Sequence, residues 1–419
     1  MRRVVVTGIG TINSTGHNVK DSFEAVVNGV CGIDTITLFD ASEFSVKIAG
    51  EVKDFDPTTV MDKKEVKKAD RFIQLGIKAA HEAMIDSGYV SAENKKVDSS
   101  IADRFGIISG SGIGGLSTIE RNSVVCETKG SRKVSPFFIP SSLANMLSGF
   151  ISIEHNLRGP SLSHVTACAA STHALNDAVK TIMIGGADRI LVVGAESAIC
   201  GAGVAGFAAM KALSTRNDDP KKSSRPFDTD RDGFVMGEGA GALVVEDLEL
   251  ALARGAKIYA EIIGFGESGD ANHITAPVMD GPLRAMQAAF EMAKNITGEY
   301  PKIDYINAHG TSTPVGDKNE TAAIKALFGG KESAPLVSST KGQIGHCLGA
   351  AGAIEAIFTI KALNEGIIPP TINIENQDPE CDLDYVANVA RKVDLTTVMS
   401  NNFGFGGTNG SVIFKKYTK

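Results

Sequence analysis

Short runs rich in valine and isoleucine alternate along this chain with longer segments in which apolar residues recur every three or four positions. The short runs predict β-strands and the longer segments predict helices, an alternation typical of parallel strands joined by crossover helices. The predicted strands lie in RRVVVTGIG, RFGIISG, RILVVGAES, AGALVVEDL, KIYAEIIGFG, KIDYINAHG, APLVSST and GSVIFKK. The fold class predicted from this pattern is α/β.

The stretch EVKKADRFIQLGIKAAHEAMIDSG shows the helical pattern most clearly. Its apolar positions recur at threes and fours: Val66, Ala69, Ile73, Ile77, Ala80 and Met84. Gly88 stands where a helix commonly ends on a glycine in the left-handed conformation. We therefore predict one helix that runs through this stretch and ends before Gly88.

An approximate repetition of motifs links the two parts of the chain. GFVMGEGAGALVVEDL resembles NNFGFGGTNGSVIFKK, and SLSHVTACAASTHALNDAVKTI resembles PLVSSTKGQIGHCLGAAGAIEAIFTIKAL. We predict a duplicated chain that joins near residues 254–257, with one half at 1–255 and the other at 256–419. In that arrangement Cys168 and His346 occupy similar places at helix N-termini and can face one cleft.

Composition narrows the function classes. Of the 419 residues, 43% are hydrophobic and 22% are charged, as in ordinary globular proteins, and the formal net charge is −7. This charge gives the whole surface no attraction for nucleic acid. No apolar segment approaches the ~20 residues that span a membrane. The start MRRVVVTGIG imitates a signal peptide, but glycines interrupt its apolar run, and we interpret it as a strand.

The six cysteines are scattered without a CxxC pair. This spacing argues against a zinc site and against a secreted disulfide framework. We therefore expect a cytoplasmic protein that contacts neither membrane nor nucleic acid.

Cys168 stands among small residues in SHVTACAAST, where an apolar segment becomes helical. A helix N-terminus carries a partial positive charge, which can lower the pKa of a thiol and stabilise a thiolate. The small neighbours leave room for a bulky group to reach the sulfur, and the amides of the turn could bind an oxyanion. A buried, inert cysteine in a tight helix contact is the alternative interpretation.

Two histidines strengthen the catalytic interpretation. His309 follows an apolar strand in NAHGTSTPVGD, and His346 lies in a glycine-flanked turn of STKGQIGHCLGAAG. Active sites of α/β proteins lie at strand ends, and the surrounding glycine and hydroxyl residues expose an imidazole to a ligand. The other histidines are interpreted as structural: His17, His81, His155, His164, His173 and His273.

Three further motifs do not carry the chemistry that they imitate. GSGIGG at 110–115 satisfies GxGxxG, but the acidic strand end expected about 20 residues later is missing. RPFDTDRDGF alternates acids like a calcium loop, but its glycine and closing glutamate are misplaced, so we predict a surface turn. GAESA lacks the serine of a hydrolase elbow.

Together, VTACAAS, NAHGTSTPVGD, STKGQIGHCLGAAG and NNFGFGGTNG resemble the motif set of the β-ketoacyl-acyl-carrier-protein synthases. The resemblance covers essentially the whole chain and is greatest to the type II elongation enzymes, partly because Ile113 stands where that type narrows the acyl pocket. It implies a thiolase fold, with duplicated halves in five α-β-α-β-α layers, and a homodimer.

The resemblance also assigns roles to residues. Cys168 matches the nucleophile, His309 and His346 match the catalytic histidines, and Lys341 matches the supporting lysine. The other matched residues are Glu355 (partner of the lysine), Phe405 (gate and oxyanion amide), Thr311 and Thr313 (pantetheine arm), and Ile113, Phe207 and Thr275 (substrate pocket). One departure is Gln343–Ile344 in KGQIGHC, where the family pattern has other residues.

The activity implied is a decarboxylative Claisen condensation that extends a cysteine-bound acyl chain by two carbons from malonyl-acyl-carrier protein. It needs no metal or redox cofactor. The basic cluster of Lys63, Lys64, Lys67 and Lys68 is the predicted docking surface for the acidic carrier; a solvated helix face is its alternative.

Rival functions are a thiolase, a non-catalytic chain-length partner of a polyketide synthase and a cysteine protease. A thiolase needs a second basic cysteine near the C-terminus, and the last cysteine, Cys381, lies outside the GFGGTN turn. A chain-length partner would lack Cys168. A protease has no role for two histidines in glycine-rich turns.

Overall fold

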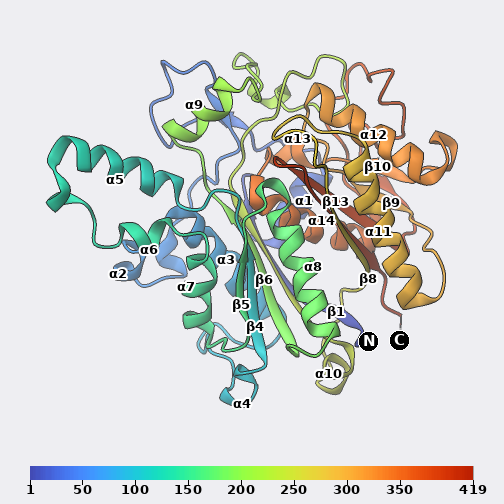
Figure 1. Cartoon of the computed structure of the whole chain (residues 1–419), viewed down its shortest axis with the longest axis horizontal. Coiled ribbons are helices and arrows are strands. Elements are labelled where there is room, and N and C mark those ends of the chain that lie inside the picture. Colours follow the sequence, from blue (N-terminus) through green and yellow to red (C-terminus); the bar gives the residue numbers. More distant parts are fainter. Residues whose placement is uncertain (419) are drawn as a thin grey trace.

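The computed structural model describes residues 1–418, which fold around a ten-stranded sheet (Figure 1). Five strands come from the first part of the chain: β1 (Val4–Asn13), β4 (Phe105–Gly110), β5 (Ser161–His164), β6 (Arg189–Glu196) and β7 (Gly239–Asp247). Five come from the second: β8 (Ala260–Gly269), β9 (Tyr305–Asn307), β10 (Leu336–Ser338), β13 (Thr397–Gly404) and β14 (Thr408–Lys415). Each of the eight segments predicted as strands overlaps one of these.

The two sets of strands share one topology. Outward from the middle of the sheet, the first set runs β1, β7, β6, β4, β5 and the second runs β8, β14, β13, β9, β10. In each set the two inner pairings are antiparallel and the two outer pairings are parallel. The sets meet where Val4–Val6 pairs with Ala260–Ile262. The same order and directions in both sets agree with the duplication that the motifs predict.

The alternation of side chains along the strands divides the core into layers. In β6, Leu191 packs in a cluster with α3 (Arg71–Asp86), whereas Val192 packs in a central cluster with α8 (Ala170–Met183) and α14 (Ala351–Glu365). In β13, Val398 belongs to the same central cluster, and Met399 faces α11 (Asp280–Thr297). Helices α8 and α14 therefore lie between the two sets of strands. The five layers are α3, the first set of strands, α8 with α14, the second set of strands, and α11, as in the thiolase fold.

The remaining helices surround these layers: α1 (Val19–Val27), α2 (Lys63–Val66), α4 (Ser99–Ala102), α5 (Leu116–Lys129), α6 (Phe138–Ser142), α7 (Met146–His155), α9 (Gly201–Ala209), α10 (Leu248–Ala253), α12 (Pro314–Phe328) and α13 (Lys341–Ile344). Two small ribbons complete the fold: β2 (Asp34–Thr35) with β3 (Ile48–Ala49), and β11 (Ile367–Ile368) with β12 (Arg391–Lys392). Helix α5 projects from the body at the left of Figure 1. Among residues 1–418, no helix is both long and apolar enough for a membrane span.

The single helix predicted across residues 65–87 is wrong in one respect. The structure has the short helix α2 and then α3, because Asp70 caps the N-terminus of α3 and accepts a hydrogen bond from the amide of Phe72 (3.2 Å). Its second carboxylate oxygen accepts hydrogen bonds from Thr118 in α5. Gly88 follows α3 with φ of +77°, as predicted for its end.

Candidate active site

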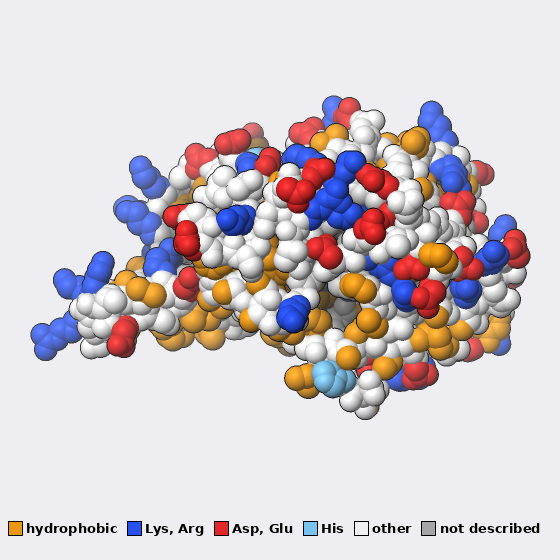
Figure 2. Space-filling model, turned by 90° about the horizontal axis from the view of Figure 1, so that it is seen from above, with side chains coloured by type: hydrophobic (Ala, Val, Ile, Leu, Met, Phe, Trp, Pro, Cys, Tyr) orange, Lys and Arg blue, Asp and Glu red, His pale blue; other side chains and the backbone are white. Residues whose placement is uncertain are grey.

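A cavity of about 350 Å³ brings the predicted catalytic residues together. Cys168, His309, His346 and Phe405 line it, although they come from four separate motifs. The cavity lies at the end of the molecule where α9 and α12 are found in Figure 1. Figure 2 views that end from above and shows hydrophobic side chains among charged ones. The walls of the cavity are mostly apolar, which suits an acyl chain or a pantetheine arm.

Cys168 lies in a tight turn at Ala167–Ala169, directly before α8. Ala167 has φ of +50°, a strained value for a residue with a side chain, and such strain concentrates at functional sites. Burial raises the pKa of the Cys168 thiol to about 12, although Lys341 and the amides of Phe405 and Cys168 act to lower it. The lowering of this pKa that a helix N-terminus can produce is therefore outweighed by desolvation of the thiol.

The two predicted histidines lie edge to face, with ring centroids 5.3 Å apart and planes at 86°. Burial, and next the charge of Lys341, lower the pKa of each imidazole well below its usual 6.5. Both rings are therefore neutral near pH 7. Within residues 1–418, neither Nδ1 atom has a hydrogen-bond partner.

Lys341 and Glu355 form the predicted pair, as a fully buried ion pair. The second carboxylate oxygen of Glu355 accepts a hydrogen bond of 2.7 Å from Asn402. Lys341 begins α13 and Glu355 lies in α14, so the pair joins the segments on either side of His346. The positive charge of Lys341 lowers the pKa of both imidazoles and acts to lower that of Cys168.

The backbone of the His309 loop is held by Glu320 of α12, a residue that the sequence analysis missed. Its two carboxylate oxygens accept hydrogen bonds from the amides of His309 (2.9 Å) and Gly310 (2.8 Å). Burial raises the pKa of Glu320 to about 7. Only its place in NAHGTSTPVGDKNE, eleven residues after the histidine, could have pointed to it.

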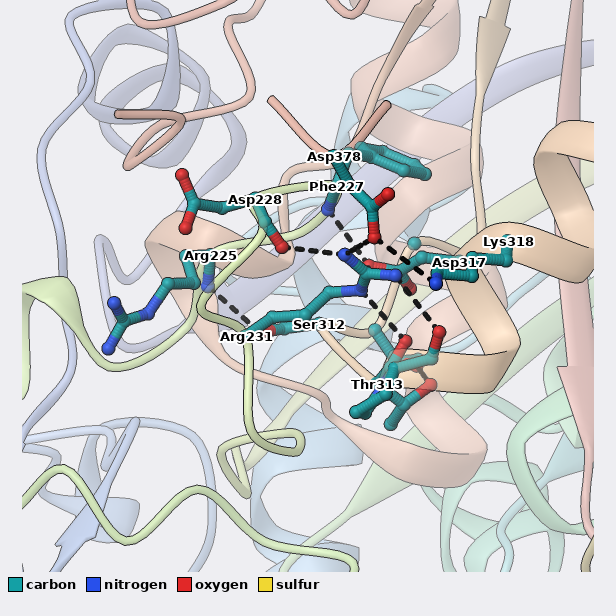
Figure 3. A network of polar contacts seen from close by, with 12 residues as sticks. Arg225, Phe227, Asp228, Arg231, Ser312, Thr313, Asp317, Lys318 and Asp378 are labelled. Carbon is teal, nitrogen blue, oxygen red and sulfur yellow. Dashed lines mark hydrogen bonds and ion pairs between the residues drawn. The ribbon is translucent and has the colours of Figure 1, made fainter. Parts of the chain in front are cut away.

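The next residues of this loop are clamped by the network in Figure 3. Arg231 donates to the carbonyls of Thr313 (3.1 Å) and Pro314 (2.9 Å) and pairs with Asp378 (2.9 Å). The predicted surface turn at RPFDTDRDGF is therefore wrong, because the Arg231 side chain is only 1% exposed. The hydroxyls of Thr311 and Thr313 lie 3.1 Å apart on the cavity wall.

The remaining pocket residues occupy different positions. Phe207 lines the cavity with its ring centroid 6.4 Å from that of Phe405. Thr275 lines the same cavity next to His273, whose Nδ1 accepts hydrogen bonds from the amides of Thr275 and Ala276. Ile113 does not line it but packs in the same apolar cluster as Cys168 and Phe207. The prediction that His273 has only a structural role is therefore incomplete, because this residue lines the cavity.

The unusual Gln343–Ile344 pair is buried beside the site. Gln343 donates a hydrogen bond to the carbonyl of Pro370 (2.8 Å), and Ile344 belongs to the central core cluster. The departure from the family pattern is thus accommodated by packing and leaves His346 on the cavity wall.

The predicted docking lysines lie in and just after α2. Lys63, Lys64 and Lys67 are exposed. Lys68 forms an ion pair of 2.5 Å with Glu65, and its ammonium lies 5.6 Å from the ring centroid of Phe137. Three of the four positive charges are therefore open to a partner.

Comparisons with known proteins agree along the whole chain. Residues 1–251 match the family described as Beta-ketoacyl synthase, N-terminal domain, and residues 259–375 match Beta-ketoacyl synthase, C-terminal domain. A curated Vibrio harveyi protein, 3-oxoacyl-(acyl-carrier-protein) synthase 2, is 50% identical over 418 residues, with 99% of each chain covered.

Solved structures give the same picture. A β-ketoacyl synthase from Burkholderia phymatum STM815 is 36% identical, with a TM-score of 0.90 and full coverage of both chains. A ketosynthase in complex with its type II polyketide acyl-carrier protein is 30% identical, with a TM-score of 0.86 and full coverage of both chains.

Proposed function

The chain belongs to the β-ketoacyl synthase family, and we propose that it elongates fatty acids by condensing a cysteine-bound acyl chain with malonyl-acyl-carrier protein. The observation that carries this proposal is the meeting of Cys168, two neutral imidazoles and a buried lysine–glutamate pair around one apolar cavity. The product is a 3-oxoacyl chain that is longer by two carbons.

The first half-reaction transfers the acyl group from its carrier to the sulfur of Cys168. The resting thiol is protonated, so its proton must leave as the carbon–sulfur bond forms, and a neutral imidazole of the same cavity can accept it. The amides of Cys168 and Phe405, which both act on the thiol, would stabilise the tetrahedral oxyanion. The carrier thiol then leaves with a proton.

The second half-reaction begins when malonyl carrier loses CO₂ and leaves enolate charge on the thioester oxygen. His309 and His346 can donate N–H groups to that oxygen, since each ring is neutral and carries one proton. The carbanion attacks the acyl carbon, and the sulfur of Cys168 leaves as a thiolate. One proton taken up from solvent then restores the resting thiol. Decarboxylation itself generates the carbanion, so the proposed reaction requires no metal or redox cofactor.

The partner in this proposal is acyl carrier protein. A carrier is the partner of the related ketosynthase complex, and the name of the Vibrio harveyi relative contains the same carrier. Thr311 and Thr313 would hold its pantetheine arm through their paired hydroxyls. The exposed lysines of the α2 region would attract its acidic surface.

We also propose that the chain forms a homodimer. In the part of the chain that the structure describes, β5 is an edge strand with no strand on its outer side. Exposed apolar side chains lie on β5 and on neighbouring segments: Phe137, Ile139, Leu143, Ile153, Leu162 and Val165. A second copy could pair edge to edge through a two-fold axis and cover this β5 patch.

The cytoplasm is the proposed compartment, because all six cysteines are free in the structure.

The thiolase alternative is disfavoured by the position of Cys381. This thiol is buried in the core cluster around Tyr385 and does not line the cavity. The chain-length partner is disfavoured because Cys168 is present at the cavity wall.

The test of the proposed function separates the two half-reactions. Cys168→Ala should form no acyl-enzyme but should still release labelled CO₂ from malonyl carrier, because both imidazoles remain. His309→Ala or His346→Ala should lower CO₂ release by about 10²–10³, the usual effect of losing one oxyanion donor, while Cys168 is still acylated in part. Intact-protein mass spectrometry and CO₂ counting give both quantities for each variant. Acylation of the Cys168→Ala cavity, or wild-type CO₂ release by the histidine variants, would contradict the assignment.

A further inference from the structure

Glu196 is a buried carboxylate for which neither half-reaction has a role. It ends β6, and its exposed fraction is 0%. It forms no ion pair within residues 1–418 of the structure. Burying a carboxylate without an ion pair lowers the stability of the fold unless hydrogen-bond donors bind its oxygens. The fold therefore has to supply such donors around Glu196.

Four donors surround this carboxylate. Oε1 accepts hydrogen bonds from the hydroxyl of Ser111 (3.0 Å) and the amide of Ile113 (3.2 Å). Oε2 accepts hydrogen bonds from the amides of Gly112 (2.6 Å) and Gly349 (3.0 Å). A protonated acid or an amide would turn a donor toward at least one of these N–H groups. Burial raises the pKa of Glu196, whereas these hydrogen bonds lower that pKa and favour the ionised form.

The position of Gly349 shows why this anion lies beside the catalytic turn. Two equivalent turns precede the central helices: Ala167–Ala169 before α8, and Leu348–Ala350 before α14. Each begins with a positive φ, +50° at Ala167 and +47° at Leu348. Gly349 is thus the counterpart of Cys168, and its amide binds the Glu196 carboxylate.

The contact is also too close for a side chain. A Cβ atom at Gly349 would lie 2.1 Å from the amide nitrogen of Gly112. The loop that carries Ile113 is therefore packed directly on the second turn, with Glu196 bonded to both.

We propose that Glu196 is a specificity-determining positioning residue, which fixes the backbone of Gly112–Ile113 and thereby sets the acyl chain length accepted at Cys168. This inference rests on the proposed function. Gly112 packs on the catalytic turn, since a Cβ atom at this position would lie 3.4 Å from the carbonyl oxygen of Ala167. Ile113 packs on the same apolar cluster as Cys168 and Phe207, so a displaced backbone at 112–113 changes the packing around the turn that carries the acylated sulfur. The loop preceding α5 has its amides at 112 and 113 held by this one side chain.

A second consequence follows from the charge of Glu196. The anion raises the pKa of the Cys168 thiol, in opposition to Lys341. Removing the charge should therefore move the alkylation of Cys168 to lower pH. A purely structural brace would leave this titration unchanged.

The test compares Glu196→Gln and Glu196→Asp with the wild-type enzyme. In the glutamine variant the amide nitrogen is best placed toward Ser111, whose hydroxyl can accept a hydrogen bond, so the Ile113 amide loses its acceptor. The loosened wall should raise the ratio of acylation rates for long against short acyl carriers by about two- to tenfold, the effect of one hydrogen bond. In the aspartate variant the ratio should also rise, because the shorter side chain cannot reach all four donors.

Alkylation of Cys168 by iodoacetamide, followed by peptide mass spectrometry across pH, gives the second readout. It should shift to lower pH in Glu196→Gln and stay near the wild-type profile in Glu196→Asp, which keeps the charge. Glu246→Gln is the control for lost stability, since Glu246 is equally buried but bonds to Arg254 away from the cavity. Its length ratio and its titration should match the wild type.

The outcomes distinguish this inference from the proposed function. If wild-type Cys168 is acylated and both Glu196 variants keep the wild-type length ratio, the inference is overturned and the proposed function stands. If no carrier acylates wild-type Cys168, the proposed function fails and the inference fails with it. Should Glu196→Gln not fold, the ratio measured for Glu196→Asp decides.

Discussion

The thiol and the two imidazoles of this site are all uncharged at rest, because burial acts in opposite directions on acids and bases. It raises the pKa of Cys168 and lowers those of His309 and His346. Ionisation therefore has to accompany acyl transfer, when the incoming thioester supplies new polar contacts. Charge develops only where the amides and the two imidazoles can stabilise it.

A change at Ile113 tests the acyl pocket directly. We expect Ile113→Phe to block long primers by filling the apolar cluster on which Cys168 and Phe207 also pack, at a packing cost of about 1–3 kcal/mol in stability. Short primers should still acylate Cys168. The measurement is the acylation rate for carriers of graded chain length; an unchanged length profile would place the pocket elsewhere.

The sequence predicted which residues meet at the site only where motifs carry them. Cys168, His309 and His346 line one cavity and Lys341 pairs with Glu355, as the motif resemblance implies, while their catalytic roles stay predictions. Glu196 and Arg231 were not recognised, because their partners are distant in sequence: Glu196 bonds the amide of Gly349, 153 residues away. No local pattern encodes such a contact.

At the scale of elements, the valine-rich strands were predictable from local sequence, whereas β13 was not. Its sequence TVMSNNFG mixes buried apolar and buried polar residues, so it shows neither alternation nor an apolar run. The buried Asn402 of this strand bonds Glu355, a partner that only the fold supplies. The break between α2 and α3 was missed for a similar reason, since Asp70 caps α3 while also binding Thr118 of α5.

The edge strand β5 carries the prediction for the proposed dimer. Leu162→Lys should raise the dimer dissociation constant by at least about tenfold, because a charged side chain on an edge strand opposes edge-to-edge pairing. Leu162 is 48% exposed, so the substitution should cost the single chain little stability. Sedimentation velocity across a concentration series measures the change.

Val389→Lys is the matched control for this prediction. Val389 is 75% exposed but lies in the second half of the chain, outside the β5 patch. The assignment of the dimer interface to β5 would be contradicted if both variants dissociated equally, or if neither variant dissociated more than the wild type.

At the scale of the whole molecule, a net charge of −7 and an acidic partner have to be reconciled. The duplicated α/β fold was accessible from the sequence, because repeated motifs imply repeated topology. The distribution of charge on the surface was not predictable from the sequence, since the exposure of a side chain depends on how the layers pack.

Figure 2 shows lysine and arginine side chains at the tip of the projection formed by α5, where Lys129, Arg132 and Lys133 are exposed. Basic groups are therefore concentrated locally on an acidic molecule.

The last prediction concerns docking of the carrier on the α2 region. Lys64→Glu with Lys67→Glu should raise the KM for carrier-bound substrate by about tenfold and spare small thioester analogues, because both side chains are exposed and bear no ion pair in the structure. Lys68 is a poorer target, since Glu65 already neutralises it. The wild-type KM should rise with salt as the Debye length falls from ~10 Å at 0.1 M to ~3 Å at 1 M. Lys392→Glu, on the exposed ribbon strand β12, is the matched control. Equal losses on carrier-bound and small substrates would show that the substitutions damage the enzyme itself, and the docking surface would then have to be sought elsewhere.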